Sequence, residues 1–287
     1  MKEIVVISGK GGTGKTSITA SFGVLGAGNT VIADCDVDAS DLHMLMNPQN
    51  TREEDFTSGA VAVIDQDACV HCGRCSRVCR FDAIPYIDDR YEVIPLDCEG
   101  CGYCAKICPA LAIKMVDQVV GRVFYSDAKT GAPMVHARLH IGAENSGKLV
   151  AKVKREAKAV AMEKGYDYVL VDGSPGIGCP VVSSLTGADV VVLVTEPTVS
   201  GLHDLKRVHQ LVRRFQIPTA CIINKADLNS EMTQELKTYL EANDILHLFD
   251  IPYDEDFTKC MVEGKTVVEI PGSRYHEIFE QGWRLLI

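Results

Sequence analysis

The sequence predicts a mostly parallel α/β fold into which a small α+β domain is inserted. Short apolar runs rich in Val and Ile alternate with stretches of helical periodicity along most of the 287 residues. Strands that are buried on both faces of a parallel sheet have this continuous apolar character. A cysteine-rich segment from about Ala60 to Val116 interrupts the alternation. We therefore expect a main domain of residues 1–59 and 117–287 and an inserted domain of residues 60–116.

The elements of the main domain follow in order from the N-terminus. Glu3–Ile7 reads as an apolar strand, and a Gly-rich turn leads from it into a helix from about Gly14 to Leu25. Residues 134–141 alternate, which predicts a half-buried strand whose basic face is solvated or contacts a partner. Further strands are predicted over residues 31–35, 168–171, 190–194 and 220–223, and helices over residues 146–164, 202–215 and 231–242.

Charge and hydropathy exclude several classes of protein. The net charge of −10 and the pI near 5.3 disfavour a protein that coats nucleic acid, because phosphate binding needs clustered Lys and Arg. No apolar run approaches the roughly 18 residues of a membrane-spanning helix. The segment 279–287 has apolar residues but no basic face, so we expect no stable membrane insertion. The N-terminus reads as a core strand rather than a signal, which predicts a cytoplasmic protein.

A phosphate-binding loop follows the first predicted strand. Residues 9–16 read G-K-G-G-T-G-K-T and match G-x4-G-K-[ST] between a strand and a helix. Glycines let the backbone N–H groups curl around phosphate oxygens at the positive end of the helix. Lys15 is expected to bridge the β- and γ-phosphates, and the Thr16 hydroxyl to ligate Mg²⁺. The predicted nucleotide-binding residues are Gly11, Gly12, Thr13, Gly14, Lys15, Thr16, Ser17 and, further along the chain, Asn224.

Eight of the twelve cysteines form two identical C-x2-C-x2-C-x3-C runs in the insert. The runs begin at Cys69 and Cys98, and the residues after them also align, so the insert is an internal duplication. Each run matches the bacterial ferredoxin pattern, in which the fourth cysteine ligates the cluster of the other run. The pattern predicts one [4Fe-4S] cluster on Cys69, Cys72, Cys75 and Cys108, and a second on Cys98, Cys101, Cys104 and Cys79.

Two details of these runs leave alternatives open. A pair of four-cysteine zinc sites is the other interpretation, although structural zinc usually joins two separated C-x2-C pairs. Pro109 follows the second run as the ferredoxin pattern expects, whereas Arg80 stands in the corresponding place after the first run. We expect this departure to alter solvent access to the cluster that uses Cys79, rather than its ligation.

The loop with its extra lysine, Lys10, resembles the deviant Walker A motif of the MinD/ParA superfamily, which includes the nitrogenase iron protein and Mrp-type cluster carriers. The resemblance covers roughly residues 1–55 and 118–287, and with the insert it is closest to the members that carry a ferredoxin domain. It implies an α/β P-loop NTPase fold and a nucleotide-dependent homodimer, in which Lys10 reaches the phosphates of the opposite subunit. It also implies that Asp36 positions the attacking water and that Asp172 binds Mg²⁺ through water. By the same resemblance, Asn224 in the N-K-A-D segment is the expected contact to the nucleotide base. The expectation of ATP rather than GTP also rests on this resemblance.

Four cysteines lie outside the two runs. Cys35, Cys221 and Cys260 are expected to be small core residues. Cys179 has the spacing from Asp172 at which the nitrogenase iron protein has a cluster ligand, but residues 109–178 contain no cysteine that could supply that family's other ligand. The sequence favours a buried, inert Cys179; a labile metal or a thiol gate shared across a dimer is the alternative.

These features predict an Mg²⁺-dependent ATPase that couples nucleotide switching to low-potential electron transfer. The expected catalytic residues are Lys10, Lys15, Asp36 and Asp172, and the expected cofactors are ATP, Mg²⁺ and two [4Fe-4S] clusters. The expected partners are a second copy of the chain and a redox protein or a protein that accepts a cluster. An iron-sulfur carrier ATPase and a positioning ATPase that senses redox state through its clusters are the alternatives.

Overall fold

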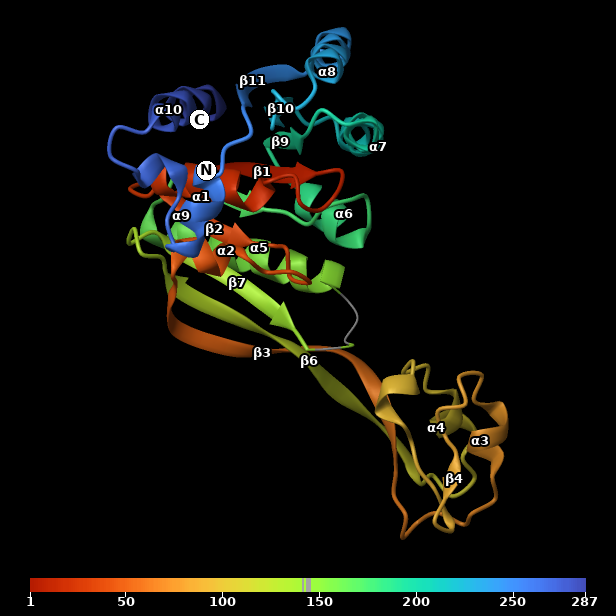
Figure 1. Ribbon diagram of the computed structural model, residues 1–287. Coiled ribbons are helices and arrows are strands. Elements are labelled where there is room, and N and C mark those ends of the chain that lie inside the picture. Colours follow the sequence, from red (N-terminus) through yellow and green to blue (C-terminus); the bar gives the residue numbers. More distant parts are fainter. Residues whose placement is uncertain (141, 143–145) are drawn as a thin grey trace. The chain divides into compact units, whose positions relative to one another are not determined.

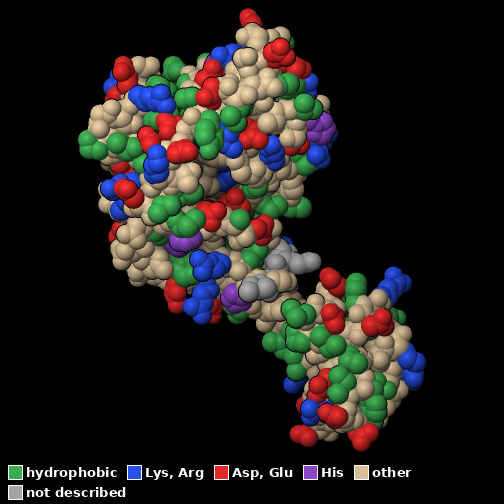
Figure 2. Space-filling view, viewed as in Figure 1, with side chains coloured by type: hydrophobic (Ala, Val, Ile, Leu, Met, Phe, Trp, Pro, Cys, Tyr) green, Lys and Arg blue, Asp and Glu red, His purple; other side chains and the backbone are tan. Residues whose placement is uncertain are grey.

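A computed structural model describes residues 1–140, 142 and 146–287 (Figure 1). The chain divides into two compact units. The first comprises Met1–Glu54, Arg122–Leu139 and the described residues from Ser146 to Ile287, and the second is built on Asp55–Gly121. The first unit is called the nucleotide unit below, and the second is called the insert. On the face drawn in Figure 2, acidic and basic side chains are interspersed on both units.

A nine-stranded sheet has the order β11-β10-β9-β1-β8-β2-β7-β6-β3. Its strands are β1 (Lys2–Ser8), β2 (Thr30–Asp34), β3 (Gln49–Ile64), β6 (Ile113–Asp127), β7 (Pro133–Leu139), β8 (Tyr168–Asp172), β9 (Val190–Thr195), β10 (Thr219–Asn224) and β11 (Leu246–Ile251). From β11 to β7 the strands pair in parallel. The predicted α/β fold with a mostly parallel sheet is therefore confirmed.

Helices cover both faces of this sheet (Figure 1). They are α1 (Lys15–Leu25), α2 (Leu42–Met46), α5 (Ser146–Lys164), α6 (Cys179–Leu185), α7 (Val199–Arg214), α8 (Ser230–Ala242), α9 (Asp256–Val262) and α10 (Arg274–Leu286). Phe22 of α1 packs against Phe279 and Trp283 of α10, with ring centroids 5.5 and 5.7 Å apart. The C-terminal apolar residues thus belong to the core, where burying an aromatic ring stabilises the fold by about 2 kcal/mol.

The register of the parallel strands brings acidic side chains together. Strands β8 and β2 pair so that Asp172 lies opposite Asp34, and β1 pairs with β8 on its other edge. The carboxyl ends of parallel strands meet at one edge of the sheet, which is where open α/β folds bind ligands. The loop after β1 and the carboxylates after β2 and β8 therefore share one site.

Some predicted boundaries needed correction. Helix α7 starts at Val199, before the predicted residue 202, because the Thr198 side chain caps it by accepting a hydrogen bond from Gly201 N. The predicted strand 134–141 is β7, and its last expected residue, Ile141, lies outside the described residues. The long strands β3 and β6 were not predicted, because β3 begins with a run of exposed polar residues and β6 has no regular alternation of buried and exposed residues.

The insert consists of two similar halves. Its elements are α3 (Arg74–Val78), the antiparallel pair β4 (Tyr86–Ile87) and β5 (Arg90–Tyr91), a 3-10 turn (Pro95–Asp97) and α4 (Tyr103–Ile107). Gly73 and Gly102 precede the two short helices with φ of 67° and 70°, a conformation that suits glycine. A small apolar core of Ala62, Ile64, Ile84 and Ile113 includes Cys75 and Cys104. So small a core gains little hydrophobic stabilisation, as is usual for domains that need a metal group or disulfides.

Candidate functional site

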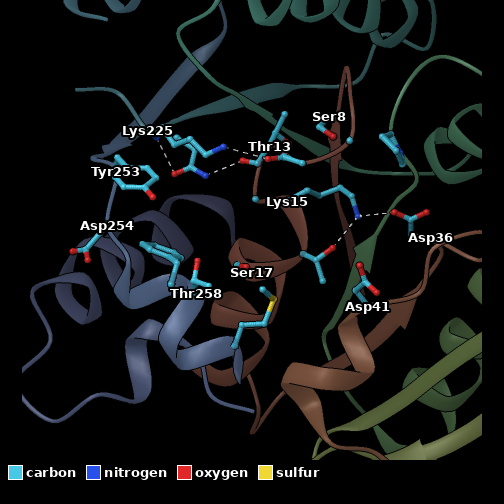
Figure 3. Close-up of a pocket in the computed structure, with 18 of the residues that line it drawn as sticks. Ser8, Thr13, Lys15, Ser17, Asp36, Asp41, Lys225, Tyr253, Asp254 and Thr258 are labelled. Carbon is cyan, nitrogen blue, oxygen red and sulfur yellow. Dashed lines mark hydrogen bonds and ion pairs between the residues drawn. The ribbon is translucent and has the colours of Figure 1, made fainter. Parts of the chain in front are cut away.

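A cavity of about 410 Å³ opens where the loop after β1 meets the ends of the neighbouring strands (Figure 3). Its lining includes all eight predicted nucleotide-binding residues, of which seven come from the phosphate loop and α1 and the eighth is Asn224. At one end Lys15 points toward Asp36, and Lys225, Tyr253 and Thr258 lie at the other end (Figure 3). The structure therefore brings the phosphate loop, Asp36 and the N-K-A-D segment to one cavity.

The backbone of the loop leaves room for phosphate oxygens. A side chain at Gly11 or Gly12 would meet no atom within 4 Å, so the space beside them is open. Gly14 has φ of 87°, and a Cβ there would lie 2.4 Å from Asn224 Nδ2, so no larger residue fits. The Thr13 hydroxyl is buried and, among the described residues, has no hydrogen-bond partner. A phosphate at the helix N-terminus would satisfy these groups, so the residues fit a nucleotide.

Lys15 is buried between two carboxylates. Its Nζ lies 2.8 Å from Asp172 Oδ1 and 3.4 Å from Asp36 Oδ2. Burial acts to lower the pKa of Lys15, but these carboxylates outweigh burial and raise it. Thr16 Oγ1 donates to Asp172 Oδ2 at 2.9 Å. A hydroxyl beside a strand-end carboxylate is the oxygen set that Mg²⁺ takes beside nucleotide phosphates, so these two residues fit the predicted ion.

Two further side chains of this cluster were missed by the sequence analysis. Thr19 Oγ1 donates to Asp172 Oδ1 at 2.9 Å. Asp34 accepts from Ser40 Oγ at 2.7 Å, and burial, together with the charge of Asp172, raises its pKa to about 7. Burial likewise raises the pKa of Asp36 more than Lys15 lowers it. The sequence offered a signal for Asp34, because it stands two residues before the predicted catalytic Asp36. Thr19 belongs to no motif, and the only signal for it is its position one helical turn after Lys15.

The end of the cavity opposite Lys15 is lined by residues that the sequence did not single out. Residues 252–254, 257, 258 and 261 line it beside Asn224 and Lys225. Asn224 Nδ2 donates to Thr13 O at 2.8 Å, so this amide also braces the phosphate loop. Asp227, the last residue of N-K-A-D, accepts a hydrogen bond of 2.5 Å from Tyr253 N and is not among the described residues that line the cavity. Its carboxylate therefore holds the 252–254 segment.

Lys10 is placed differently from Lys15. Its Nζ lies 2.6 Å from Glu196 Oε1 and 3.0 Å from Ser200 Oγ, and Lys10 is not among the described residues that line the cavity. Glu196, just after β9, also pairs with Lys225 at 3.0 Å. Burial acts to raise the pKa of Glu196, but the two lysines outweigh it and lower the pKa.

The insert holds two pockets, each lined by four cysteines from both runs. One pocket is lined by Cys69, Cys72, Cys75 and Cys108. The other is lined by Cys98, Cys101, Cys104 and Cys79. In each pocket the fourth cysteine comes from the other run, which is the grouping that the ferredoxin pattern predicts.

Each pocket offers four cysteine thiols, a donor set that zinc and a [4Fe-4S] cluster can both take. Among the described residues, no three His, Cys, Asp or Glu side chains converge as the ligands of one metal ion. A tetrahedral zinc site draws its sulfurs to about 2.3 Å from one ion. A [4Fe-4S] cluster is also held by four thiolates, but these surround a larger body. Four cysteines around an apolar pocket are consistent with that arrangement.

The remaining cysteines divide as follows. Cys35, Cys221 and Cys260 are buried, which confirms their predicted place in the core. The expectation of a buried Cys179 was wrong, because this residue is exposed at the start of α6. The tight glycine-rich turn before it, with Gly176 at φ of 91°, directs the chain to the surface there. Within the described residues, no helix is both long and apolar enough to cross a membrane.

Comparison with known proteins agrees with this geometry. Residues 4–267 match the family model described as the CobQ/CobB/MinD/ParA nucleotide binding domain. An uncharacterised protein of Methanocaldococcus jannaschii is 34% identical over 230 residues, which are 79% of this chain and 79% of that protein.

Solved structures share the fold at lower identity. The septum site-determining protein MinD with Mg-ADP from Pyrococcus horikoshii matches with a TM-score of 0.60 and 19% identity, covering 99% of this chain and 95% of that chain. The MinC:MinD cell division complex of Aquifex aeolicus matches with a TM-score of 0.59 and 18% identity, covering 100% and 96%. The fold, the phosphate loop and the family match together confirm the predicted resemblance to the MinD/ParA superfamily, and the chain belongs to the CobQ/CobB/MinD/ParA nucleotide-binding family.

Proposed function

We propose that the protein is an Mg²⁺-dependent ATPase whose nucleotide state controls electron transfer through two [4Fe-4S] clusters in the insert. The nucleotide half of this proposal is supported by the open phosphate loop, the orphaned Thr13 hydroxyl and the Lys15–Asp172 pair. The redox half is carried by one observation: each pocket of the insert gathers three cysteines of one run and the fourth of the other.

In the proposed hydrolysis, water attacks the γ-phosphorus, the bond to the β-γ bridging oxygen breaks, and ADP and phosphate leave. Lys15 neutralises charge on the β- and γ-phosphates, and Thr16 with Asp172 would hold Mg²⁺, which would supply further positive charge there. Asp36 orients the water, because its carboxylate lies at the cavity 3.4 Å from Lys15 Nζ. Lys10 is proposed to act on a phosphate held by a second copy of the chain.

ATP is the proposed nucleotide for a structural reason. An aspartate that reads guanine must turn its carboxylate toward the base, but Asp227 accepts from Tyr253 N instead. Asn224 remains beside the cavity as the polar contact for the base. We expect the protein to bind ATP at least tenfold more tightly than GTP, as competition with a fluorescent ATP analogue would show.

When bound, the clusters would supply one-electron transfer between a protein donor and a protein acceptor, with no change of bonding in the chain. The eight cysteines would hold them, and the apolar side chains of Ile64, Ile84 and Ile113 would limit water around them. Segments 34–41 and 172–179 carry the residues proposed to face the γ-phosphate. The first segment continues along the chain toward the insert, and the second ends at Cys179. A change of nucleotide at the cavity can therefore change the conformation of both segments.

The proposal is tested with anaerobically purified protein. Iron content, Mg²⁺-dependent ATP hydrolysis and ATP-dependent reduction of a one-electron acceptor protein are measured in the natural chain, in Lys15→Ala and in Cys101→Ser. We expect Lys15→Ala to keep its iron but to lose hydrolysis and ATP-dependent reduction. Cys101→Ser should keep nucleotide binding and lose about half of the iron. Iron-free protein that hydrolyses ATP would contradict the redox half.

A second function, transfer of an iron-sulfur cluster to an acceptor protein, is favoured by one observation. Cys179 is exposed and directly follows the segment that carries Asp172. Cluster transfer to an apo-ferredoxin that is lost in Cys179→Ser, but kept in Cys101→Ser, would favour this carrier function over electron transfer. A redox-sensing positioning ATPase would instead show hydrolysis that depends on oxidation state, without electron delivery.

A further inference from the structure

We propose that Glu196 is a positioning residue that competes with nucleotide phosphate for Lys10. The inference rests on the proposed function, in which Lys10 contacts a terminal phosphate. It adds a specific restraint: the Glu196 carboxylate holds Lys10 against the N-terminus of α7, and Lys10 must leave this carboxylate before it can act.

The contacts of the Lys10 side chain are with described residues that do not line the cavity. Its Nζ lies 2.6 Å from Glu196 Oε1, 3.0 Å from Ser200 Oγ and 3.5 Å from Thr198 Oγ1. Lys15, five residues later, lines the cavity instead. The two lysines of the loop therefore have separate carboxylate partners, and a phosphate in the cavity meets Lys15 without any movement of Lys10.

The position of Lys10 is favourable only because Glu196 is there. Thr198 caps α7 and Ser200 lies in its first turn, so the Lys10 ammonium sits at the positive end of a helix of 16 residues. A cation at that end is destabilised by the helix dipole. The Glu196 side chain is only 13% exposed, so its charge is partly shielded from water and offsets this penalty.

The backbone around Glu196 is fixed, which makes it a firm anchor. A Cβ at Gly201 would lie 2.2 Å from Glu196 O, so only glycine allows α7 to start this close to β9. Gly9, next to Lys10, similarly allows close approach to the Asp204 backbone, 2.6 Å from where a Cβ would be. The phosphate loop and the start of α7 therefore pack directly on each other, and the Lys10 side chain is the part that can move.

Glu196 also pairs with Lys225, and this contact supplies the control. Lys225 Nζ lies 3.0 Å from Glu196 Oε2 and 3.4 Å from Gly12 O. If Glu196 served only to join β9, β10 and the loop, removing Lys225 would have the same effect as removing the Glu196 charge. If Glu196 restrains Lys10, only the loss of Lys10 cancels the effect.

The test compares Glu196→Gln, Glu196→Asp, Lys225→Met, Lys10→Met and the double variant Lys10→Met with Glu196→Gln. Affinities for a non-hydrolysable ATP analogue and for ADP are measured by calorimetry, and the dimer fraction by sedimentation. We expect Glu196→Gln to bind the analogue roughly three- to tenfold more tightly and to dimerise at lower concentration, with ADP unchanged. Glu196→Asp should restore the natural affinity, and Lys225→Met should not reproduce the gain.

In the Lys10→Met background, Glu196→Gln should change the analogue affinity less than twofold. An unchanged or weaker affinity in Glu196→Gln, or an equal gain without Lys10, would overturn the inference while leaving the proposed function standing. If the natural chain binds no ATP analogue, the proposed function fails first and the inference fails with it. Fluorescence of Trp283, the single tryptophan, checks that each variant is folded.

Discussion

Lys15 Nζ and Asp172 Oδ1 lie 2.8 Å apart, although 157 residues separate them in the chain. Both side chains are almost fully buried, at 6% and 1% exposure. A buried ion pair gains stability only while both partners are present, and removing one leaves an uncompensated charge. Phosphate and Mg²⁺ are the natural replacements, since the phosphate pairs with Lys15 and the ion with Asp172.

This ion pair predicts different effects on nucleotide binding for the substitution of each partner. Lys15→Ala should lower ATP affinity at least a hundredfold, because it removes the main cation facing the phosphates, and should destabilise the protein by about 3 kcal/mol. Asp172→Asn should keep nucleotide binding but make it insensitive to Mg²⁺. Titration with a fluorescent ATP analogue, with and without EDTA, checks both. Lys265→Ala, at an exposed pair, serves as the control; equal loss in this variant would contradict the assignment.

Asp34 predicts a dependence of stability on pH. Its pKa in the folded protein is about 7, above the 3.8 of an ordinary Asp, so the folded state binds more protons than the unfolded state between these values. Stability should therefore fall as the pH rises from 4 to 7 and level off above that. Asp34→Asn should be more stable than the natural chain at pH 8 by about 1–3 kcal/mol, and the gap should close toward pH 5. Urea unfolding followed by Trp283 fluorescence measures this, and a constant gap would contradict it.

The cysteine pockets predict a pattern of iron loss in paired variants. Two [4Fe-4S] clusters give about eight irons per chain. Cys69 and Cys108 line the same pocket. The double variant Cys69→Ser with Cys108→Ser should therefore lose no more iron than either single variant, which is about four irons per chain. Cys69→Ser with Cys79→Ser removes a ligand from each pocket and should lose nearly all of it. Iron assay of anaerobically purified protein distinguishes these, and the reverse pattern would mean that each run binds its own metal.

The two halves of the insert differ in charge at equivalent positions. Arg74 lines the first pocket where Tyr103 lines the second, and Glu99 lines the second where Val70 lines the first. A nearby cation stabilises a reduced cluster and raises its potential, whereas an anion lowers it. Arg74→Gln should lower the higher of two midpoint potentials, and Glu99→Gln should raise the lower. Redox titration by EPR tests this. If either substitution shifted the other midpoint potential instead, the assignment of the higher potential to the pocket with Arg74 and of the lower to the pocket with Glu99 would be contradicted.

The features that could be predicted from the sequence are those that depend on residues close together in the chain. The strands β1, β2, β8, β9 and β10 were predictable because continuous burial leaves an uninterrupted apolar run. The phosphate loop was predictable because backbone geometry dictates its glycines. Pairing between β2 and β8 was not, so the place of Asp34 opposite Asp172 emerged only from the register.

Other residues of the site could not be recognised from the sequence, because they belong to no motif. Tyr253 and Thr258 reach the end of the cavity opposite Lys15 from a segment after β11 that has no motif. Glu196 is an ordinary acidic residue in sequence, and its two lysine partners, Lys10 and Lys225, lie on either side of it in the chain, Lys225 at a separation of 29 residues. Cys179 was misjudged, because exposure in a glycine-rich turn depends on how that turn packs rather than on its composition.

The measurement that tests the account most directly is anaerobic redox titration by EPR, with protein bound to ADP and to a non-hydrolysable ATP analogue. We expect two low-potential [4Fe-4S] signals, and a midpoint or line shape that changes with the analogue in the natural chain but not in Lys15→Ala. Signals that are identical in both nucleotide states would contradict control of electron transfer by the nucleotide, and the absence of cluster signals would contradict the redox function altogether.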